Sequence, residues 1–255
     1  MKKALLHHFT LSILFCLICT PLFAQVPTPA QFLGYELGER FTPHYRVIDY
    51  YEAVADEVQN ISLTQYGETN EHRPLVLTYI TAPENFDKLD EIRQANLQRA
   101  GMEEDAPSGY DDISIVWLSY NVHGNEAVST EAALQVLYDL ADKSNSRTQE
   151  WLKNTVVIID PCINPDGRDR YVNWYNQRVA RVPNPTPEAW EHTEPWPGGR
   201  TNHYYFDLNR DWAWATQKES RERLVMYNKW LPHIHVDFHE QGVNSPYYFA
   251  PAAQP

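Results

Sequence analysis

The sequence predicts an α/β fold in which a mixed, mostly parallel sheet has helices on both faces. Amphipathic helical segments alternate with short apolar segments along the chain. The apolar segments from residue 113 onward are nearly continuous, as in strands that helices cover on both sides. With 255 residues, of which 43% are hydrophobic and 13% aromatic, the chain can build one sizeable core. A disordered chain is therefore excluded.

The apolar pattern predicts the elements in chain order. Residues 45–59 place apolar side chains on one helical face. Residues 61–66 and 75–80 predict the two strands of a hairpin, separated by Gly67 and a polar turn. The remaining expected helices are 84–100, 127–141 and 213–230, and the remaining expected strands are 113–121, 155–161 and 233–238.

The segment 164–212 interrupts this alternation. It begins with Asn-Pro-Asp-Gly at 164–167 and continues through a proline-rich run at 183–199 that is dense in aromatic residues. A loop of this length inside a compact domain is usually functional or disordered. Because disordered segments are poor in aromatic residues, we expect an ordered wall rather than a flexible linker.

The first 24 residues have the pattern of a signal peptide. Lys2 and Lys3 precede an apolar run at 11–19, and Ala24 offers a small residue for cleavage. The run is shorter than the ~20 residues that span a bilayer. A buried helix, or a lipid anchor on Cys16 or Cys19, is the alternative. We expect an exported protein, periplasmic or secreted, without a stable membrane anchor after cleavage. The mature chain would have a lead-in at 25–40 and one main domain from 41 to 255.

The net charge and the cysteine content exclude several classes of partner and reaction. The formal net charge of -13 argues against nucleic acid or an anionic membrane as the main partner. Once the signal peptide is removed, Cys162 is the only cysteine, so the mature chain cannot form an intrachain disulfide. Its apolar surroundings predict a buried side chain rather than a nucleophile. Hydrolytic chemistry would have to come from His, carboxylates, Ser or a metal.

A pair of candidate metal ligands follows the strand at 113–121. His123 and Glu126 are three residues apart at the start of the next helix, where both side chains can turn toward one point. An imidazole and a carboxylate suit Zn²⁺ in a catalytic site. The motif alone is weak, but ligands in α/β sheets bind at the carboxyl ends of strands.

A third ligand is predicted at the end of another strand. His239 follows the strand at 233–238 and is nearer its carboxyl end than His233 and His235, which we expect to be ordinary hydrogen-bonded histidines. Glu240 is expected to point away from the metal, which makes it a poor general base.

Residues 207–210, Asp-Leu-Asn-Arg, supply a candidate anion clamp. Arg210 can grip a carboxylate bidentately, and Asn209 adds a neutral donor beside it. A surface turn with a salt bridge is the plainer interpretation. Beside a metal, the pair would hold a substrate's terminal carboxylate.

Four motifs together resemble those of the zinc metallocarboxypeptidases: HGNEA at 123–127, NPDG at 164–167, DLNR at 207–210 and DFHE at 237–240. HGNE and DLNR look closer to the N/E type of this family than to the pancreatic digestive type. The resemblance runs from about residue 40 to the end. It implies the carboxypeptidase α/β fold, one Zn²⁺ per chain and a peptide or protein substrate with a free C-terminal carboxylate. It also implies the site residues, with His123, Glu126 and His239 as zinc ligands, Asn209 and Arg210 on the substrate carboxylate, and Asp207 orienting the first His.

The family also has an arginine that polarises the scissile carbonyl, and a catalytic Glu. Arg168, Arg170, Arg178 and Arg181 compete for the first role, and we select Arg178. In the family the catalytic Glu comes well after the third ligand, and only 16 residues follow His239. We therefore expect the general base beyond Pro255, with a domain that is incomplete at its C-terminus.

Three functions remain open from the sequence. The chain is part of an exported zinc carboxypeptidase, a non-catalytic module that keeps the metal and carboxylate clamp, or a zinc amidase acting on acyl amino acids or cell-wall peptide. As given, the fragment is expected to hydrolyse poorly, because removing a general base typically costs ~10²–10⁴-fold in rate.

Overall fold

A computed structural model describes residues 26–242 of the chain. The predicted signal peptide at 1–24 lies outside these residues. The helices are α2 (Pro29–Leu33), α3 (His44–Glu57), α4 (Pro83–Phe86), α5 (Leu89–Arg99), α6 (Val128–Ala141), α7 (Ser146–Leu152), α8 (Pro165–Arg178) and α9 (Lys218–Trp230). The strands are β1 (Ile61–Glu68), β2 (Pro74–Ile80), β3 (Ser114–Tyr120), β4 (Thr155–Asp160) and β5 (Ile234–Phe238).

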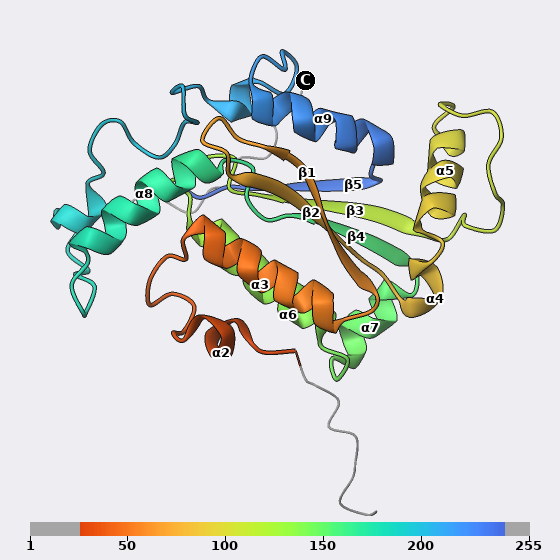
Figure 1. The fold of residues 1–255 in the computed structure, drawn as a ribbon, viewed down its shortest axis with the longest axis horizontal. Helices are drawn as coiled ribbons and strands as arrows, with labels where there is room; N and C mark the ends of the chain where they lie inside the picture. Colours follow the sequence, from red (N-terminus) through yellow and green to blue (C-terminus); the bar gives the residue numbers. More distant parts are fainter. Residues whose placement is uncertain (1–25, 243–255) are drawn as a thin grey trace, which may run out of the picture.

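Within residues 26–242 the strands form one mixed sheet in the order β1-β2-β4-β3-β5 (Figure 1). The predicted β1–β2 hairpin is antiparallel, and β2 also pairs antiparallel with β4. β4, β3 and β5 are parallel to one another. The carboxyl ends of these three strands therefore meet at one edge of the sheet, where ligands bind in such folds.

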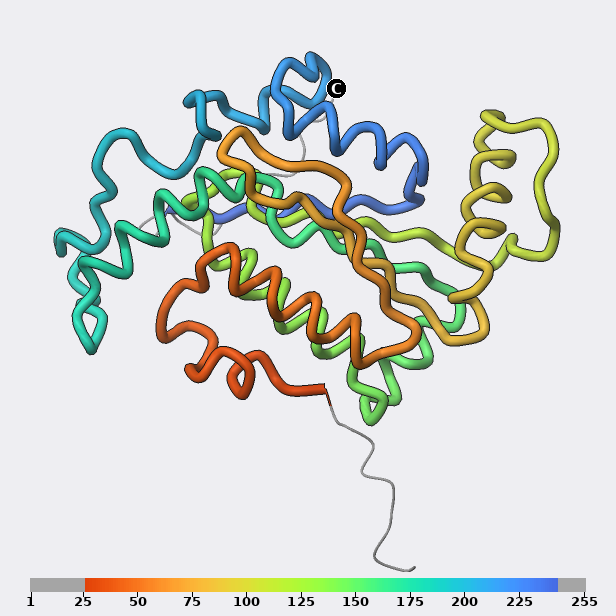
Figure 2. The backbone as a smooth tube through the Cα atoms, in the orientation of Figure 1, coloured from red at the N-terminus to blue at the C-terminus, as the bar shows by residue number. Residues whose placement is uncertain are grey.

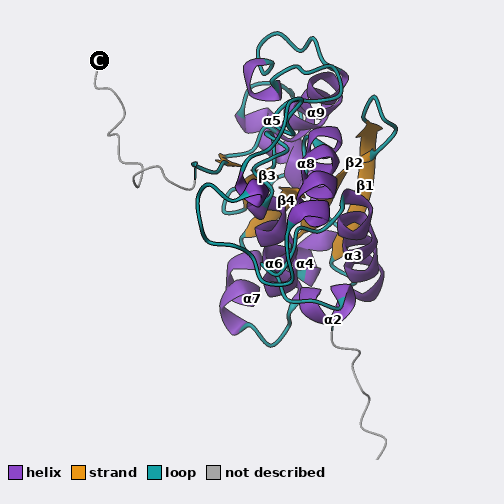
Figure 3. Ribbon diagram, turned by 90° about the vertical axis from the view of Figure 1, so that its left-hand side faces the viewer, coloured by secondary structure: helices purple, strands orange, loops and turns teal. Residues whose placement is uncertain are grey.

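Helices cover both faces of the sheet, as predicted. On one face, α3 and α6 pack against side chains such as Val157 and Ile159 of β4. On the other face, α5 and α9 pack against the alternate residues Val156 and Ile158. The strands lie between α9 and the α3–α6 pair in both ribbon views (Figures 1 and 3). Because β4 is apolar on both faces, its sequence shows a continuous run rather than an alternation.

Three expectations about elements differ from the structure. The helix predicted at 213–230 begins only at Lys218. The predicted helix at 84–100 is two helices, α4 and α5, with a break at Asp87 and Lys88. The segment 164–212, expected to be a loop, begins with the fourteen-residue helix α8. Its buried positions include Asp166, Arg168 and Asp169, so its inward face is largely polar and gives little apolar periodicity.

The start of α8 nevertheless has local helix signals. The side chain of Asn164 accepts a hydrogen bond from the backbone N–H of Gly167, and Pro165 occupies the first turn. After α8 the chain turns back along the helix before it reaches α9 (Figure 2). Arg170 of α8 holds this returning segment by donating to the carbonyls of Gly198 and Asn202. These hydrogen bonds tie the returning segment to α8, whereas its order stays a prediction from the aromatic content.

Between residues 26 and 242, no helix combines the length and apolar character needed to cross a bilayer.

Candidate metal centre

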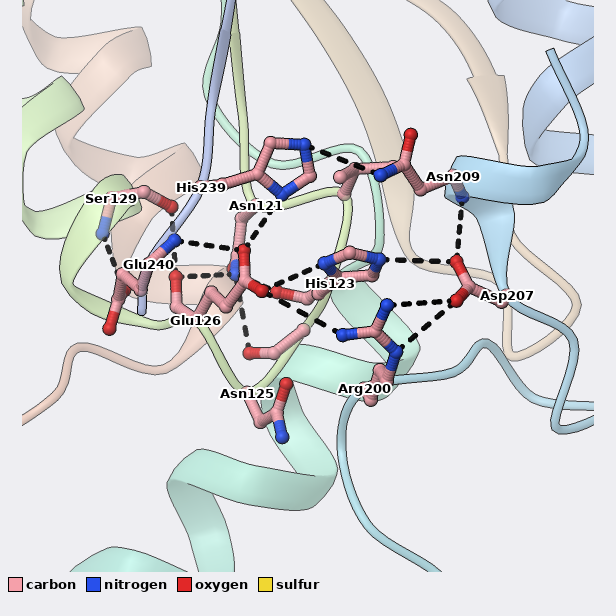
Figure 4. A network of polar contacts seen from close by, with 12 residues as sticks. Asn121, His123, Asn125, Glu126, Ser129, Arg200, Asp207, Asn209, His239 and Glu240 are labelled. Carbon is pink, nitrogen blue, oxygen red and sulfur yellow. Dashed lines mark hydrogen bonds and ion pairs between the residues drawn. The ribbon is translucent and has the colours of Figure 1, made fainter. Parts of the chain in front are cut away.

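The loop that joins β3 to α6 carries the first two predicted ligands. His123 is buried, and its Nδ1 lies 2.8 Å from Oε1 of Glu126 (Figure 4). The backbone N–H of Glu126 donates to the carbonyl of His123, closing a tight turn. The loop therefore directs both side chains to one point, as their spacing predicts.

His239 reaches the same point from the neighbouring strand. β5 lies beside β3 in parallel, with Tyr120 paired to Phe238, so both strands end at the same place. His239 Nδ1 lies 3.0 Å from Oε2 of Glu126, and the rings of His123 and His239 are 4.9 Å apart. The structure thus brings the three predicted ligands together, with one ligand atom of each within 4.8 Å of the others.

A carboxylate contacts the outward nitrogen of each imidazole. His123 Nε2 lies 3.1 Å from Asp207, and His239 Nε2 lies 3.1 Å from Asp237. A ring proton on Nε2 would be held by these carboxylates and would leave Nδ1 to bind a cation. Carboxylates in this position orient metal-binding imidazoles and raise their basicity. Asp207 lies where it was predicted, whereas a partner for His239 was not predicted.

The electrostatics keep the carboxylates of the centre ionised. Burial raises the pKa of Glu126, but the hydrogen bond and charge of His123 outweigh burial and lower the pKa overall. Burial also raises the pKa of Asp207, and the charges of His123 and Arg200 more than offset it. Two imidazole nitrogens and one ionised carboxylate form the donor set of a catalytic Zn²⁺ with an open position. The described residues therefore fit zinc.

The structure places Arg200, not Arg178, beside the centre. The Arg200 guanidinium donates to Asp207 at 3.0 Å and comes within 3.9 Å of Glu126. Arg178, predicted to polarise the scissile carbonyl, lies at the end of α8 with its guanidinium over the ring of Trp190. Arg168 is buried against Glu131, and Arg170 binds backbone carbonyls.

Sequence reasoning missed Arg200 because the position of the returning segment is a tertiary feature. A local signal was available, since Arg200 directly follows Gly198 and Gly199 and precedes Asp207 by seven residues. Glycines allow a close backbone approach, which suits a loop that must pack tightly beside the centre.

The predicted carboxylate clamp lies at the rim of the centre. Asn209 and Arg210 belong to the short 3-10 helix at Leu208–Arg210, which Asp207 caps by accepting from the Asn209 N–H. The Asn209 amide lies 3.4 Å from His239 Nε2. The Arg210 side chain is exposed, with a hydrogen bond to the Asn209 carbonyl. Asn209 therefore touches the centre, whereas Arg210 points into solvent beside it.

The residues expected not to be ligands have structural contacts. His233 Nδ1 accepts from the backbone N–H of Ile115, and His235 lies 3.0 Å from the Ser119 hydroxyl. Cys162 is buried. The Glu240 side chain accepts from the Ser129 N–H at the start of α6, turned away from the ligand atoms.

Glycines allow three segments of the site to come into backbone contact: the loop after β3, the start of α8 and the segment before Arg200. The metal loop is the segment 122–127, which carries His123 and Glu126. A Cβ on its Gly124 would overlap the α8 backbone at Gly167 and Arg168 and the carbonyl of Gly199. A Cβ on Gly167 would meet the Gly199 carbonyl in the same way. A small apolar cluster of Val122, Ile163 and Leu208 joins the same loops. The centre is therefore assembled by close backbone packing as well as by side-chain contacts.

A cleft of about 550 Å³ opens beside the ligands. Its walls come from the metal loop, α8, the returning segment and the chain after β5. The lining residues are Asn125, Glu126, Tyr171, His192, Glu194, Arg200, Glu240, Gln241 and Gly242. The candidate ligand Glu126 and the neighbouring Arg200 thus both face this opening.

Comparisons with known proteins agree with this geometry. A family model described as zinc carboxypeptidase matches residues 47–228, which is 182 of the 255 residues. Carboxypeptidase 2 of Trichophyton rubrum is 30% identical over 129 residues, covering 49% of this chain and 18% of that protein. Probable carboxypeptidase 2 of Arthroderma benhamiae is 29% identical over the same length. The matched region thus spans less than a fifth of these relatives.

Solved carboxypeptidase structures share the fold. A putative carboxypeptidase A from Shewanella denitrificans aligns with a TM-score of 0.53 at 17% identity, covering 79% of this chain and 41% of that one. Carboxypeptidase A from Helicoverpa armigera aligns with a TM-score of 0.50 at 15% identity, covering 82% and 47%. The family match over most of the chain, together with the converging ligands, shows that this protein belongs to the zinc carboxypeptidase family.

Proposed function

We propose that the protein is an exported zinc-dependent carboxypeptidase that hydrolyses the C-terminal peptide bond of peptides or proteins. The observation that carries the proposal is the convergence of His123, Glu126 and His239, with a carboxylate behind each imidazole. These three residues would hold one Zn²⁺. When bound, the ion would supply a Lewis acid and an activated water.

The other residues of the centre supply binding and charge stabilisation. Arg200 lies beside Glu126 with a fixed guanidinium, so it can stabilise negative charge that develops on a scissile carbonyl. Asn209 and the exposed Arg210 offer donors for a terminal carboxylate. A free C-terminus would thus be held next to the metal, which lowers the entropic cost of the reaction.

The described carboxylates at the centre already have other partners. Glu126 is a ligand, Asp207 contacts His123 and Arg200, and Glu240 binds the start of α6. None of these three is assigned the proton transfer. Export is supported by the N-terminal sequence, with its two lysines, apolar run and Ala24.

A paired-peptide assay on the full-length zinc-loaded protein tests the proposal. One peptide has a free C-terminal carboxylate and the other has the same sequence with a C-terminal amide. We expect release of the last residue from the first peptide, loss of that activity with a chelator and recovery with Zn²⁺. Equal cleavage of the amidated peptide would contradict the carboxylate clamp. Stoichiometric zinc without hydrolysis of either peptide would favour a binding module.

A further inference from the structure

Asn121 occupies an unusual position directly before the metal loop. It follows β3, is fully buried and has a backbone φ of 60°, in the left-handed region. Asparagine, aspartate and glycine adopt this region more readily than other residues. The residue types that the backbone tolerates here are therefore few, and only one of them carries an amide.

The Asn121 amide binds the backbone of the metal loop (Figure 4). Its Nδ2 donates to the carbonyls of His123 at 2.7 Å, Gly124 at 3.3 Å and Glu126 at 2.9 Å. These carbonyls belong to both predicted loop ligands and the glycine that follows the first one. A single side chain thus gathers the inward carbonyls of the turn that aims His123 and Glu126 at one point.

The oxygen of the same amide is fixed by buried donors. Oδ1 accepts from Arg168 at 3.2 Å and from the Thr130 hydroxyl at 3.2 Å. Arg168 is itself fully buried, and its Nη1 also donates to the carbonyl of Ala127, the residue that follows Glu126. Because these donors require an oxygen in this place, the amide nitrogen must face the loop carbonyls.

We propose that Asn121 is a positioning residue for the metal centre, which holds the loop in the shape that brings His123 and Glu126 to a common point. The inference rests on the proposed metal function. The amide acts through the loop backbone and not on the metal. Without the Nδ2 donor the three carbonyls would lose the contact that joins them, and the His123 and Glu126 carbonyls would keep only the Glu126 N–H and the Ser129 hydroxyl. The turn would then relax, so the two ligands would separate.

Asn121→Asp is the sharpest test because it changes the chemistry and keeps the shape. Aspartate has nearly the same volume and tolerates the left-handed backbone, but it presents an acceptor to the loop carbonyls in place of a donor. Asn121→Gly is the second variant. It keeps the backbone conformation at no steric cost and removes the amide. If aspartate prevents folding, glycine still tests the inference.

Asn96→Asp is the matched control. Asn96 is also buried, and its amide donates to the carbonyls of Trp230 and Leu231, both at 2.9 Å, at the end of α9. The substitution removes a comparable amide from a site outside the metal loop. It separates a general loss of stability from a specific loss of loop geometry.

The experiment measures the Zn²⁺ dissociation constant of the full-length protein by chelator competition, and the visible absorption of the Co²⁺-substituted protein, which reports ligand geometry. We expect Asn121→Asp and Asn121→Gly to weaken zinc binding by about 10–100-fold, the usual effect of losing a partner behind the ligands, and to change the Co²⁺ spectrum. Asn96→Asp should keep the affinity and spectrum of the unsubstituted protein.

Wild-type zinc affinity and an unchanged Co²⁺ spectrum in both Asn121 variants would overturn the inference and leave the proposed function intact. An equal loss in Asn96→Asp would also overturn it, because the effect would then be general destabilisation. Failure of the unsubstituted protein to bind Zn²⁺ would remove the proposed function itself, and the inference with it.

Discussion

Both ring nitrogens of His123 and His239 have carboxylate contacts. Each Nδ1 faces a different oxygen of Glu126, and each Nε2 faces an aspartate, Asp207 or Asp237. Two of these contacts join distant parts of the chain, since Asp207 lies 84 residues from His123 and Glu126 lies 113 residues from His239. The imidazoles are therefore oriented before a cation binds, which reduces the rearrangement that binding requires.

Arg200 is the arginine whose loss should damage catalysis. Because its guanidinium lies beside Glu126 and Asp207, we expect Arg200→Ala to lower kcat for peptide hydrolysis by ~10²–10³-fold, as for other groups that stabilise developing charge. The measurement is steady-state kinetics on a peptide with a free C-terminus, with zinc content determined for each variant.

Arg178→Ala is the control for that experiment. Arg178 stacks on Trp190 at the end of α8, so its loss should leave kcat unchanged. A larger loss of kcat in Arg178→Ala than in Arg200→Ala would restore the prediction made from sequence. That prediction considered only which arginines lie between the NPDG and DLNR motifs in the sequence. The structure selects Arg200 because the segment after α8 returns to the centre at that residue.

At the level of elements, the centre depends on how closely its loops pack. The metal loop, the start of α8 and the segment before Arg200 meet at Gly124, Gly167 and Gly199. Backbones that approach this closely leave no room for a Cβ, so glycine is needed at these positions whatever their backbone torsion angles. The glycines of the HGNE and NPDG motifs are therefore needed for packing, in addition to the residues of the site that bind or react.

We expect Gly124→Ala to destabilise the protein by about 1–3 kcal/mol or more and to weaken zinc binding. The added methyl would overlap backbone atoms of α8, which cannot move without shifting the helix. The measurements are denaturant unfolding and chelator competition.

Gly198→Ala is the comparison variant for this effect. A Cβ there would meet the carboxylate of Glu194, a side-chain end whose displacement would cost its hydrogen bonds from Asn125 and Gly199 but would not shift a helix. We therefore expect a smaller loss of stability. If Gly124→Ala kept the stability and zinc affinity of the unsubstituted protein, the backbone contact between the motifs would not be needed.

Helix α8 shows the limit of periodicity as a predictor. Its cap and proline are visible in the sequence, but its buried face includes Asp166, Arg168 and Asp169, which bind Arg73, Glu131 and the backbone of His44. Helices that bury polar side chains against loops lack the apolar stripe by which helices are recognised. The strands and α3 and α6 bury apolar side chains, and their predicted positions were right to within a few residues.

For the molecule as a whole, a buried carboxyl group links stability to pH. Asp160, at the carboxyl end of β4, is fully buried, and burial raises its pKa to about 7 despite the nearby positive charge of Arg223. An unfolded aspartate ionises near pH 4. Between these values the folded protein holds a proton that the unfolded chain has released, so the contribution of Asp160 to stability is fully present below pH ~4 and is lost as pH rises toward 7.

Asp160→Asn should remove this dependence. Relative to the variant, the unsubstituted protein should lose on the order of 1 kcal/mol of unfolding free energy per pH unit over that window. Denaturant unfolding of both proteins at several pH values between 4 and 8 measures the difference. Parallel stability curves would show that Asp160 is ionised in the folded protein over the whole range.

The kinds of residues in the site, and the layered fold that carries them, follow from local sequence. Strand and helix patterns depend on burial of neighbouring side chains, and HGNE and DLNR hold their ligands and donors within a few residues. The contacts of Arg200, Asp237 and Asn121 depend on segments that are far apart in the chain or on a buried turn. The return of the chain after α8, the pairing of β3 with β5 and the packing of the loop backbones bring these residues into contact. All three arise only when the whole domain is folded.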